Sequence, residues 1–340
     1  MNEAIYKKIK SNLDALSKPL DGLGDFEEII ARMGGIMQDE KVDINNAAVL
    51  VFISDNGIIR EGVSQSDESV TESVAKMLGK RQTSVCFMAK KAGISVYPYN
   101  IGMKNRLEID GVSNKYYISP STHDFLEREA MSDEQMRSAI DAGKEITREL
   151  FDRGNKVVLL GEMGIGNTTT STAVIASILK LSPEEITGKG AGLSDEGLIR
   201  KIEVIRGGIS KYKLYEKAPL EVLKSVGGYD IAAMLGVIEA AYEIGIPVIL
   251  DGLITVAAAL VAVSINEDYK EVLFFSHEGK EKGIKQVASA LNMKPIIRAN
   301  MALGEGTGAV MYYELLKIAK AVYDANSTFQ DSKIEAYVRL

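Results

Sequence analysis

The residue whose setting points most directly to chemistry is Glu305, a lone carboxylate among glycines in the segment Leu303-Gly304-Glu305-Gly306-Thr307-Gly308. Because glycine has no side chain, both ligand and backbone can approach such a carboxylate closely. A flat aromatic ligand packed against it would bury the carboxyl group and raise its pKa, which suits a proton acceptor. From this segment alone, a loop glutamate that faces water remains open as an interpretation.

A second glycine-rich segment, Gly161-Glu162-Met163-Gly164-Ile165-Gly166-Asn167-Thr168, is placed to bind an anion. It follows an apolar run and precedes a helix-length segment, where backbone N–H groups and the helix dipole attract phosphate. The spacing is similar to a P-loop, but Asn167 stands where the lysine for the outer phosphates should be. ATP hydrolysis is therefore disfavoured, whereas a single phosphate group needs less charge. A plain glycine-rich turn with Thr168 as the helix N-cap stays open.

A third flexible loop, residues 188–197, leads into another predicted helix. Ser194 is expected to cap that helix, and acidic residues follow in its first turn. Lys201, further along the helix, is placed to reach a phosphate, although a solvated charge is the simpler interpretation of a lone lysine. We expect His277 to be structural and Cys86 to be a small core residue.

Composition narrows the possible functions of the 340-residue chain. The formal net charge of -7 disfavours a sequence-general nucleic-acid binder, which needs a basic surface. One cysteine and no apolar leader at the N-terminus favour a cytoplasmic protein. The longest apolar piece, residues 252–266, falls short of the about 20 residues that a membrane span needs, so we expect a buried helix. With two histidines and one cysteine, no His/Cys metal site is expected, and no cofactor is implied. A carboxylate magnesium site stays open, but no clear spacing indicates one.

Short apolar runs rich in β-branched residues alternate with helix-length segments. Most of the runs are apolar throughout, as in strands that are covered on both faces. The sequence therefore predicts an α/β fold, a three-layer, Rossmann-like parallel sheet with helices on both faces. The predicted strands are 48–53, 93–97, 156–160, 246–250, 272–275 and 295–297, and the clearest helices are 133–153, 168–181, 228–244 and 309–325.

Helical segments at both ends of the chain predict a second, smaller unit. Residues 1–40 and 309–340 are expected to form a small helical domain, and residues 41–308 a large α/β domain that binds nucleotide and carries out catalysis. Ligands of such sheets bind beyond the carboxyl ends of the strands. Small, polar and acidic residues follow most of the predicted strands, so that edge is the candidate site.

Taken together, these segments resemble the nicotinate-nucleotide:dimethylbenzimidazole phosphoribosyltransferase family of cobamide biosynthesis. The similarity keeps its order along nearly the whole chain. It rests on Ser17–Gly24, Asp55–Gly57 with Glu61–Ser64 and Val70-Thr71, Gly161–Thr169, Gly190–Leu193 with Asp195–Leu198 and Arg200–Ile202, Val226–Met234, Pro247–Gly252, Ser276-His277 and Leu303–Gly308.

The resemblance implies transfer of 5-phosphoribose from nicotinate mononucleotide to a lower-ligand base such as 5,6-dimethylbenzimidazole, with inversion at the anomeric carbon and release of nicotinate. It implies dimers whose site lies near the subunit contact, and Glu305 as the catalytic base. No metal is demanded, since no pyrophosphate leaves. Phosphate and ribose contacts fall on Glu162, Gly164, Gly166, Asn167 and Lys201, and the acceptor and nicotinate pocket on Asp55, Ser66, Val74, Leu303 and Gly304.

Three positions depart from the family pattern. Asn56 replaces a histidine, Val74 replaces a glutamine or methionine, and Gly279 replaces a serine. An apolar Val74 suits a phenolic ring, and one branch of the family uses phenol or p-cresol as a heterodimer of homologous subunits. The alternatives are therefore a homodimer that uses a benzimidazole, a phenol-accepting subunit of a heterodimer, a non-catalytic partner subunit, and a P-loop-like phosphotransferase.

Overall fold

The computed structural model describes residues 1–190 and 192–338, so Ala191 of the third loop and residues 339–340 of the predicted small domain lie outside the described residues. Five parallel strands form one sheet in the order β2-β1-β3-β4-β5. Its strands are β1 (Ala47–Ser54), β2 (Ser95–Gly102), β3 (Val157–Met163), β4 (Val248–Leu250) and β5 (Leu273–Phe275). The predicted parallel α/β sheet is confirmed.

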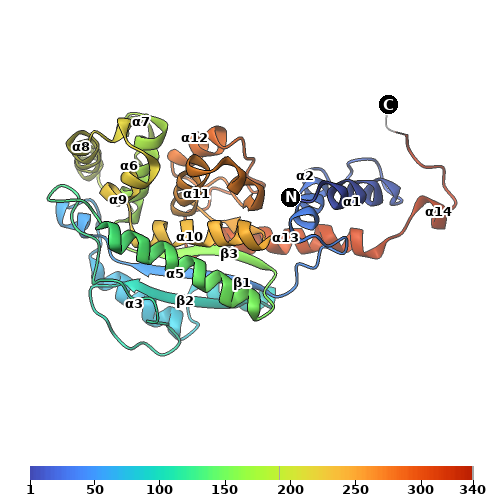
Figure 1. The fold of residues 1–340 in the computed structure, drawn as a ribbon, viewed down its shortest axis with the longest axis horizontal. Helices are drawn as coiled ribbons and strands as arrows, with labels where there is room; N and C mark the ends of the chain where they lie inside the picture. Colours follow the sequence, from blue (N-terminus) through green and yellow to red (C-terminus); the bar gives the residue numbers. More distant parts are fainter. Residues whose placement is uncertain (191, 339–340) are drawn as a thin grey trace.

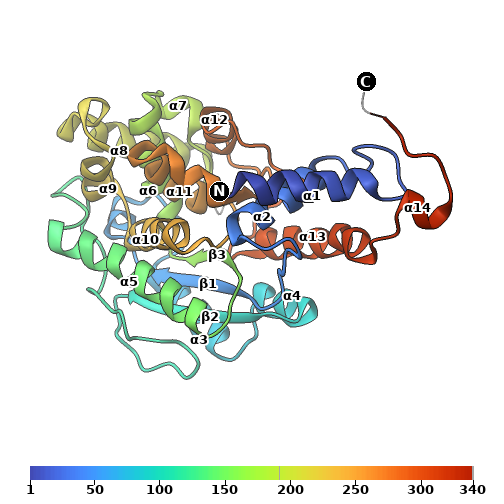
Figure 2. The same ribbon diagram turned by 45° about the vertical axis from the view of Figure 1, so that its right-hand side comes forward.

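Helices cover both faces of this sheet (Figures 1 and 2). The helices α5, α10 and α11 pack on one face, and α3, α4 and α13 on the other. The larger helices are α1 (Glu3–Ala15), α2 (Asp25–Met37), α3 (Glu68–Gly79), α4 (Ser84–Ala92), α5 (Asp133–Asp152), α6 (Asn167–Leu179), α8 (Asp195–Tyr212), α9 (Pro219–Val226), α10 (Tyr229–Ile244), α11 (Leu253–Ile265), α12 (Gly283–Ala290) and α13 (Thr307–Ala325). Short helical turns are η1 (Gly57–Glu61), α7 (Pro183–Ile186), η2 (Leu214–Glu216), η3 (Glu267–Val272) and α14 (Phe329–Ser332).

The apolar patterning explains this layering. Every residue of β1 is buried, as expected for a central strand with helices above and below. The helix α11 is buried along most of its length, which agrees with the buried helix predicted for residues 252–266. No helix among residues 1–190 and 192–338 is both long and apolar enough to cross a membrane.

One predicted strand is wrong. Residues 295–297 make only a single parallel bridge, between His277 and Ile297, and do not join the sheet as a sixth strand. Pro295 begins the run and has no backbone N–H to donate to a ladder. The N–H groups of Ile296 and Ile297 both turn to one acceptor, the carbonyl of Ser276, at 3.2 and 3.0 Å.

The N-terminal helices α1 and α2 lie beside α13 at one side of the molecule (Figures 1 and 2). The N–H of Ser17 donates to the carbonyl of Ser327 at 2.8 Å, and Asn12 donates to the hydroxyl of Tyr323 at 3.3 Å. The helix α13 also packs against β3, β4 and α4. The helix α13 thus runs from the sheet to the helical end, and the division into two domains stays a prediction.

Candidate active site

Glu305 lies at the carboxyl edge of the sheet, in a turn that leads into α13. Three successive residues of this turn have left-handed backbone angles, with φ of 84° at Gly304, 60° at Glu305 and 94° at Gly306. The turn presses on the end of β3, where a Cβ added to Gly161 would lie 2.3 Å from the carbonyl oxygen of Glu305. Gly161 is therefore glycine because two backbones meet there.

The carboxyl group of Glu305 faces the start of α4. Its Oε2 accepts a hydrogen bond from the N–H of Val85 at 3.4 Å, and the hydroxyl of Thr83 also interacts with it. Burial raises the pKa of Glu305 above its usual value, while the bonds from Thr83 and Val85 oppose the rise. The side chain is half-buried, so it combines a raised proton affinity with access from outside.

Glu162 joins the turn of Glu305 to the glycine-rich segment after β3. A Cβ on Gly304 would lie 3.1 Å from its Oε1, and the amide of Asn167 donates to its other oxygen. The same amide group lies 3.3 Å from Oδ2 of Asp230, which is fully buried at the start of α10. Burial and the charge of Asp230 raise the pKa of Glu162 to about 8, and burial raises the pKa of Asp230 to about 6.

The start of α6 is not capped by Thr168, the alternative that the sequence left open. The N-cap is Gly166, with φ of 95°, and Thr168 already lies inside the helix. A left-handed residue was needed where the backbone leaves the strand, and glycine adopts that conformation without strain. The hydroxyl of Thr168 is thereby released from capping and accepts a hydrogen bond from the ammonium group of Lys201 at 2.8 Å.

Lys201 is a buried lysine rather than a solvated charge. Its side chain on α8 is 1% exposed, and burial lowers its pKa to about 8. A Cβ on Gly190 would lie 3.3 Å from its Nζ and 3.1 Å from the hydroxyl of Thr168, so the loop after α7 crosses close to both groups. Ser194 caps α8 as predicted, with its hydroxyl accepting the N–H of Gly197. An ammonium group, a hydroxyl and a helix N-terminus meet here, the combination that binds a phosphate.

The remaining predicted pocket residues are spread over the same edge. Asp55 follows β1 and accepts the N–H of Lys104 at 2.8 Å, and burial raises its pKa to about 6. Ser66 precedes α3, Val74 packs half-buried on α3, and Leu303 is 54% exposed beside Glu305. Asp55 lines a cavity of about 290 Å³ with Met103 and the first turns of α3, and none of the other predicted pocket residues lines it.

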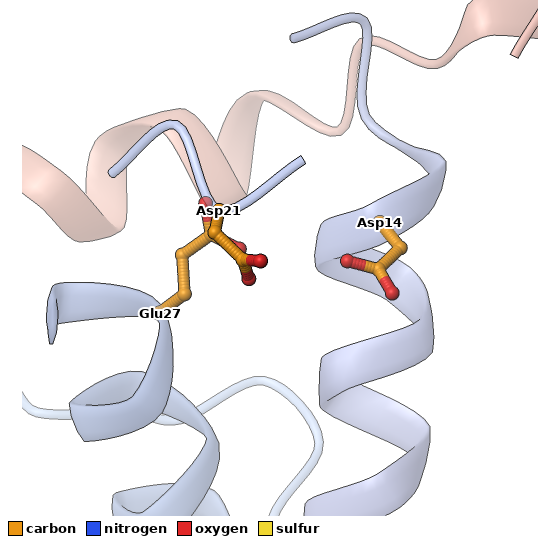
Figure 3. Close-up of side chains that lie close together, drawn as sticks. All are labelled: Asp14, Asp21 and Glu27. Carbon is orange, nitrogen blue, oxygen red and sulfur yellow. The ribbon is translucent and has the colours of Figure 1, made fainter. Parts of the chain in front are cut away.

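His277 and Cys86 are both buried, which agrees with the structural roles expected for them. Among the described residues, one group of carboxylates lies close enough together to hold a metal ion, namely Asp14, Asp21 and Glu27. Asp14 on α1 faces the other two across the helical end of the molecule, away from the carboxyl edge of the sheet (Figure 3). The ammonium group of Lys18 lies 2.6 Å from Glu27 and already balances its charge.

The family model DBI_PRT, described as a phosphoribosyltransferase, matches residues 1–334. The chain belongs to this phosphoribosyltransferase family. It is therefore a pentosyltransferase, as the sequence predicted.

The similarity to known proteins extends over nearly the full length of this phosphoribosyltransferase. A nicotinate-nucleotide--dimethylbenzimidazole phosphoribosyltransferase of Ruminiclostridium cellulolyticum is 36% identical over 337 residues, covering 99% of this chain and 96% of its own. One of the same name from Acetivibrio thermocellus is 36% identical, covering 98% and 96%. The crystal structure of CobT from Thermus thermophilus is 31% identical and superposes with a TM-score of 0.92 over 98% of this chain and 100% of its own.

The structure adds three residues to which the sequence analysis gave no role. Asp230 shares the Asn167 amide with Glu162, Thr83 contacts Glu305, and Asp251 binds the backbone next to Glu305. Asp251 was recognisable, since an acidic residue directly after a buried strand lies at the ligand edge of the sheet. Nothing in the sequence around Thr83 distinguishes it from an ordinary residue before a helix.

Proposed function

We propose that this phosphoribosyltransferase moves 5-phosphoribose from nicotinate mononucleotide to a lower-ligand base such as 5,6-dimethylbenzimidazole, giving an α-riboside 5′-phosphate for the cobamide nucleotide loop. The observation that carries the proposal is the contact between two loops. The half-buried carboxyl of Glu305 lies in a turn that touches Glu162, and the segment after Glu162 leads to the ammonium–hydroxyl pair of Lys201 and Thr168.

The chemistry follows from that arrangement. Lys201, Thr168 and the start of α6 bind the 5′-phosphate, which fixes the ribose. A ring nitrogen of the acceptor attacks the anomeric carbon, and the bond to the pyridinium nitrogen of nicotinate breaks with its electron pair. The N–H proton of the acceptor passes to Glu305, whose raised pKa suits that task. In its ionised form, the carboxylate of Glu305 also stabilises the cationic character of the sugar in the transition state.

The identity of the acceptor can be tested directly with a panel of aromatic compounds. The purified chain is incubated with nicotinate mononucleotide and, in separate reactions, 5,6-dimethylbenzimidazole, benzimidazole, phenol or p-cresol, and the products are identified by mass. We expect a benzimidazole riboside phosphate and equimolar nicotinate. Product from the phenols alone would assign the chain to the phenol-accepting branch, and no product from any acceptor would favour a non-catalytic subunit.

We infer that the enzyme is a homodimer that forms through α13. An apolar stripe on this helix is exposed at the i, i+4, i+7 and i+11 spacing at which like helices pair. The stripe begins within two turns of Glu305, so a second copy would lie near the site. Its residues are Met311, Leu315, Ile318 and Val322.

Ile318 offers a specific test of this assembly, because it is 69% exposed in the stripe. Sedimentation of the parent at micromolar concentration should give a dimer, and Ile318→Glu should give a monomer. A parent that sediments as a monomer but pairs with a homologous subunit would support the heterodimer. We also infer a cytoplasmic location, which the single cysteine favours.

A further inference from the structure

Asp251 makes an unusually complete set of contacts for a side chain with no role so far. It is 2% exposed and directly follows β4. Its Oδ2 accepts the N–H of Gly306 at 3.0 Å, and its Oδ1 accepts the N–H groups of Gly308 at 2.7 Å and Ala309 at 3.2 Å. One carboxylate thus binds three backbone donors at the start of α13, where an anion is also favoured by the helix dipole.

These bonds act on the residue that precedes them. Gly306 follows Glu305 directly, so the bond from its N–H fixes the peptide unit that joins the two residues. The carbonyl side of that unit is pressed against Gly161. Glu305 has φ of 60°, a left-handed conformation that strains a non-glycine residue and persists only where its surroundings hold it. Asp251 and Gly161 hold it from opposite sides.

Asp251 is itself held from behind. The ring of His277 packs so closely on α13 that a Cβ on Gly308 would lie 2.0 Å from Nδ1. The same Nδ1 lies 3.0 Å from the hydroxyl of Ser276 and 3.9 Å from Oδ1 of Asp251. The titratable groups that act on the carboxylate are therefore His277 behind it and Glu162 and Glu305 toward the site. This packing leaves Asp251 little freedom to follow a shifted loop.

We propose that Asp251 is a positioning residue for the transfer reaction, and that its carboxylate holds the Glu305–Gly306 peptide so that the carboxyl of Glu305 meets the acceptor. The inference rests on the proposed function, because it explains what holds Glu305, the base of that reaction, in its position. It is separate from donor binding, because the bonds of Asp251 go to the turn of Glu305 and not to Lys201 or Thr168.

The test is Asp251→Asn, alone and combined with Glu305→Gln. The amide keeps the size of the carboxylate, but its NH₂ group would face a backbone N–H, and two donors cannot pair. The matched control is Asp39→Asn, since Asp39 also accepts two backbone N–H groups, from Lys41 and Asp43, at the helical end of the molecule. Each variant is assayed for kcat with nicotinate mononucleotide and 5,6-dimethylbenzimidazole, for the Kd of the nucleotide by calorimetry, and for Tm.

We expect Asp251→Asn to lower kcat at least about tenfold with the nucleotide Kd changed less than about twofold, and Asp39→Asn to leave both unchanged. In the Glu305→Gln background, Asp251→Asn should lower kcat no further, because residues that act through one another are not additive. The same fractional loss in both backgrounds, or a parental kcat for Asp251→Asn, would overturn the proposal.

A variant that fails to fold is handled by Asp251→Glu, which keeps the charge but displaces it, and the same readouts apply. Failure of both variants to fold would make Asp251 a folding determinant and overturn the proposal. A failure of the proposed function is distinguishable, because it appears as a parent enzyme without product or as a Glu305→Gln variant with parental turnover.

Discussion

Lys201→Met should stabilise the free enzyme while it weakens donor binding. Burial lowers the pKa of Lys201 to about 8, from the 10.5 of an exposed lysine, which is a cost of about 3 kcal/mol to the folded state at neutral pH. Methionine fills similar space without a charge. It loses the hydrogen bond to Thr168, which contributes about 1 kcal/mol. The expected net gain in the free energy of unfolding is therefore about 2 kcal/mol.

The pH dependence gives this prediction a second signature. The folded-state pKa of Lys201 is depressed, so between pH 8 and 10.5 the unfolded chain binds the extra proton. The stability of the parent therefore rises with pH through that window, and the advantage of Lys201→Met, full below pH 8, disappears toward pH 10.5. Urea unfolding at pH 7 and pH 10 measures both limits.

Donor binding should change in the opposite direction. Loss of a charge-assisted hydrogen bond to phosphate costs about 1.5–3 kcal/mol, a roughly 10- to 100-fold weaker Kd for nicotinate mononucleotide by calorimetry. The control is Lys189→Met, since Lys189 lies in the neighbouring loop, is exposed and pairs with Asp195 at 2.7 Å. It should change neither quantity appreciably. A Lys201→Met variant that is less stable than the parent at pH 7, or that binds the nucleotide normally, would contradict this prediction.

Two further predictions concern Glu305. Gly161→Ala should lower kcat at least about tenfold in a steady-state assay, because its Cβ would lie 2.3 Å from the carbonyl oxygen of Glu305 and force the loop away; unchanged turnover would contradict the contact. Thr83→Val should raise the pKa of Glu305 further, because the hydroxyl of Thr83 lowers it. The acid limb of the kcat/KM profile, where protonation of Glu305 abolishes activity, should then move to higher pH; a shift to lower pH would be inconsistent with that contact.

The sequence predicted the sheet well because strands that are buried on both faces are apolar at nearly every position. The strand β1 is apolar at nearly every position, and the structure buries all of it. Residues 295–297 were wrongly predicted as a strand because three apolar residues have the composition of one. Whether they pair with the sheet depends on where the chain returns after α12. Pro295 already argued against a strand here, because proline has no backbone N–H to donate.

The candidate site was predictable in its loops but not in its electrostatics. Glycine spacing singled out Glu305 and the loop of Asn167, because glycine marks close approach, whereas Glu162 was predicted from the family resemblance. The sequence could not show that Lys201 is buried, since that depends on the loop around Gly190 folding over it. Nor could it pair Asp251 with Gly306, because 54 residues separate them and only the adjacency of β3 and β4 brings them together.

The proposed reaction depends on Glu305 as the proton acceptor of phosphoribosyl transfer. Its most direct test is the kcat of Glu305→Gln with nicotinate mononucleotide and 5,6-dimethylbenzimidazole, measured beside calorimetric binding of the nucleotide. We expect a loss of at least about 100-fold in kcat with near-parental nucleotide affinity. A Glu305→Gln variant that turns over at close to the parental rate would contradict it.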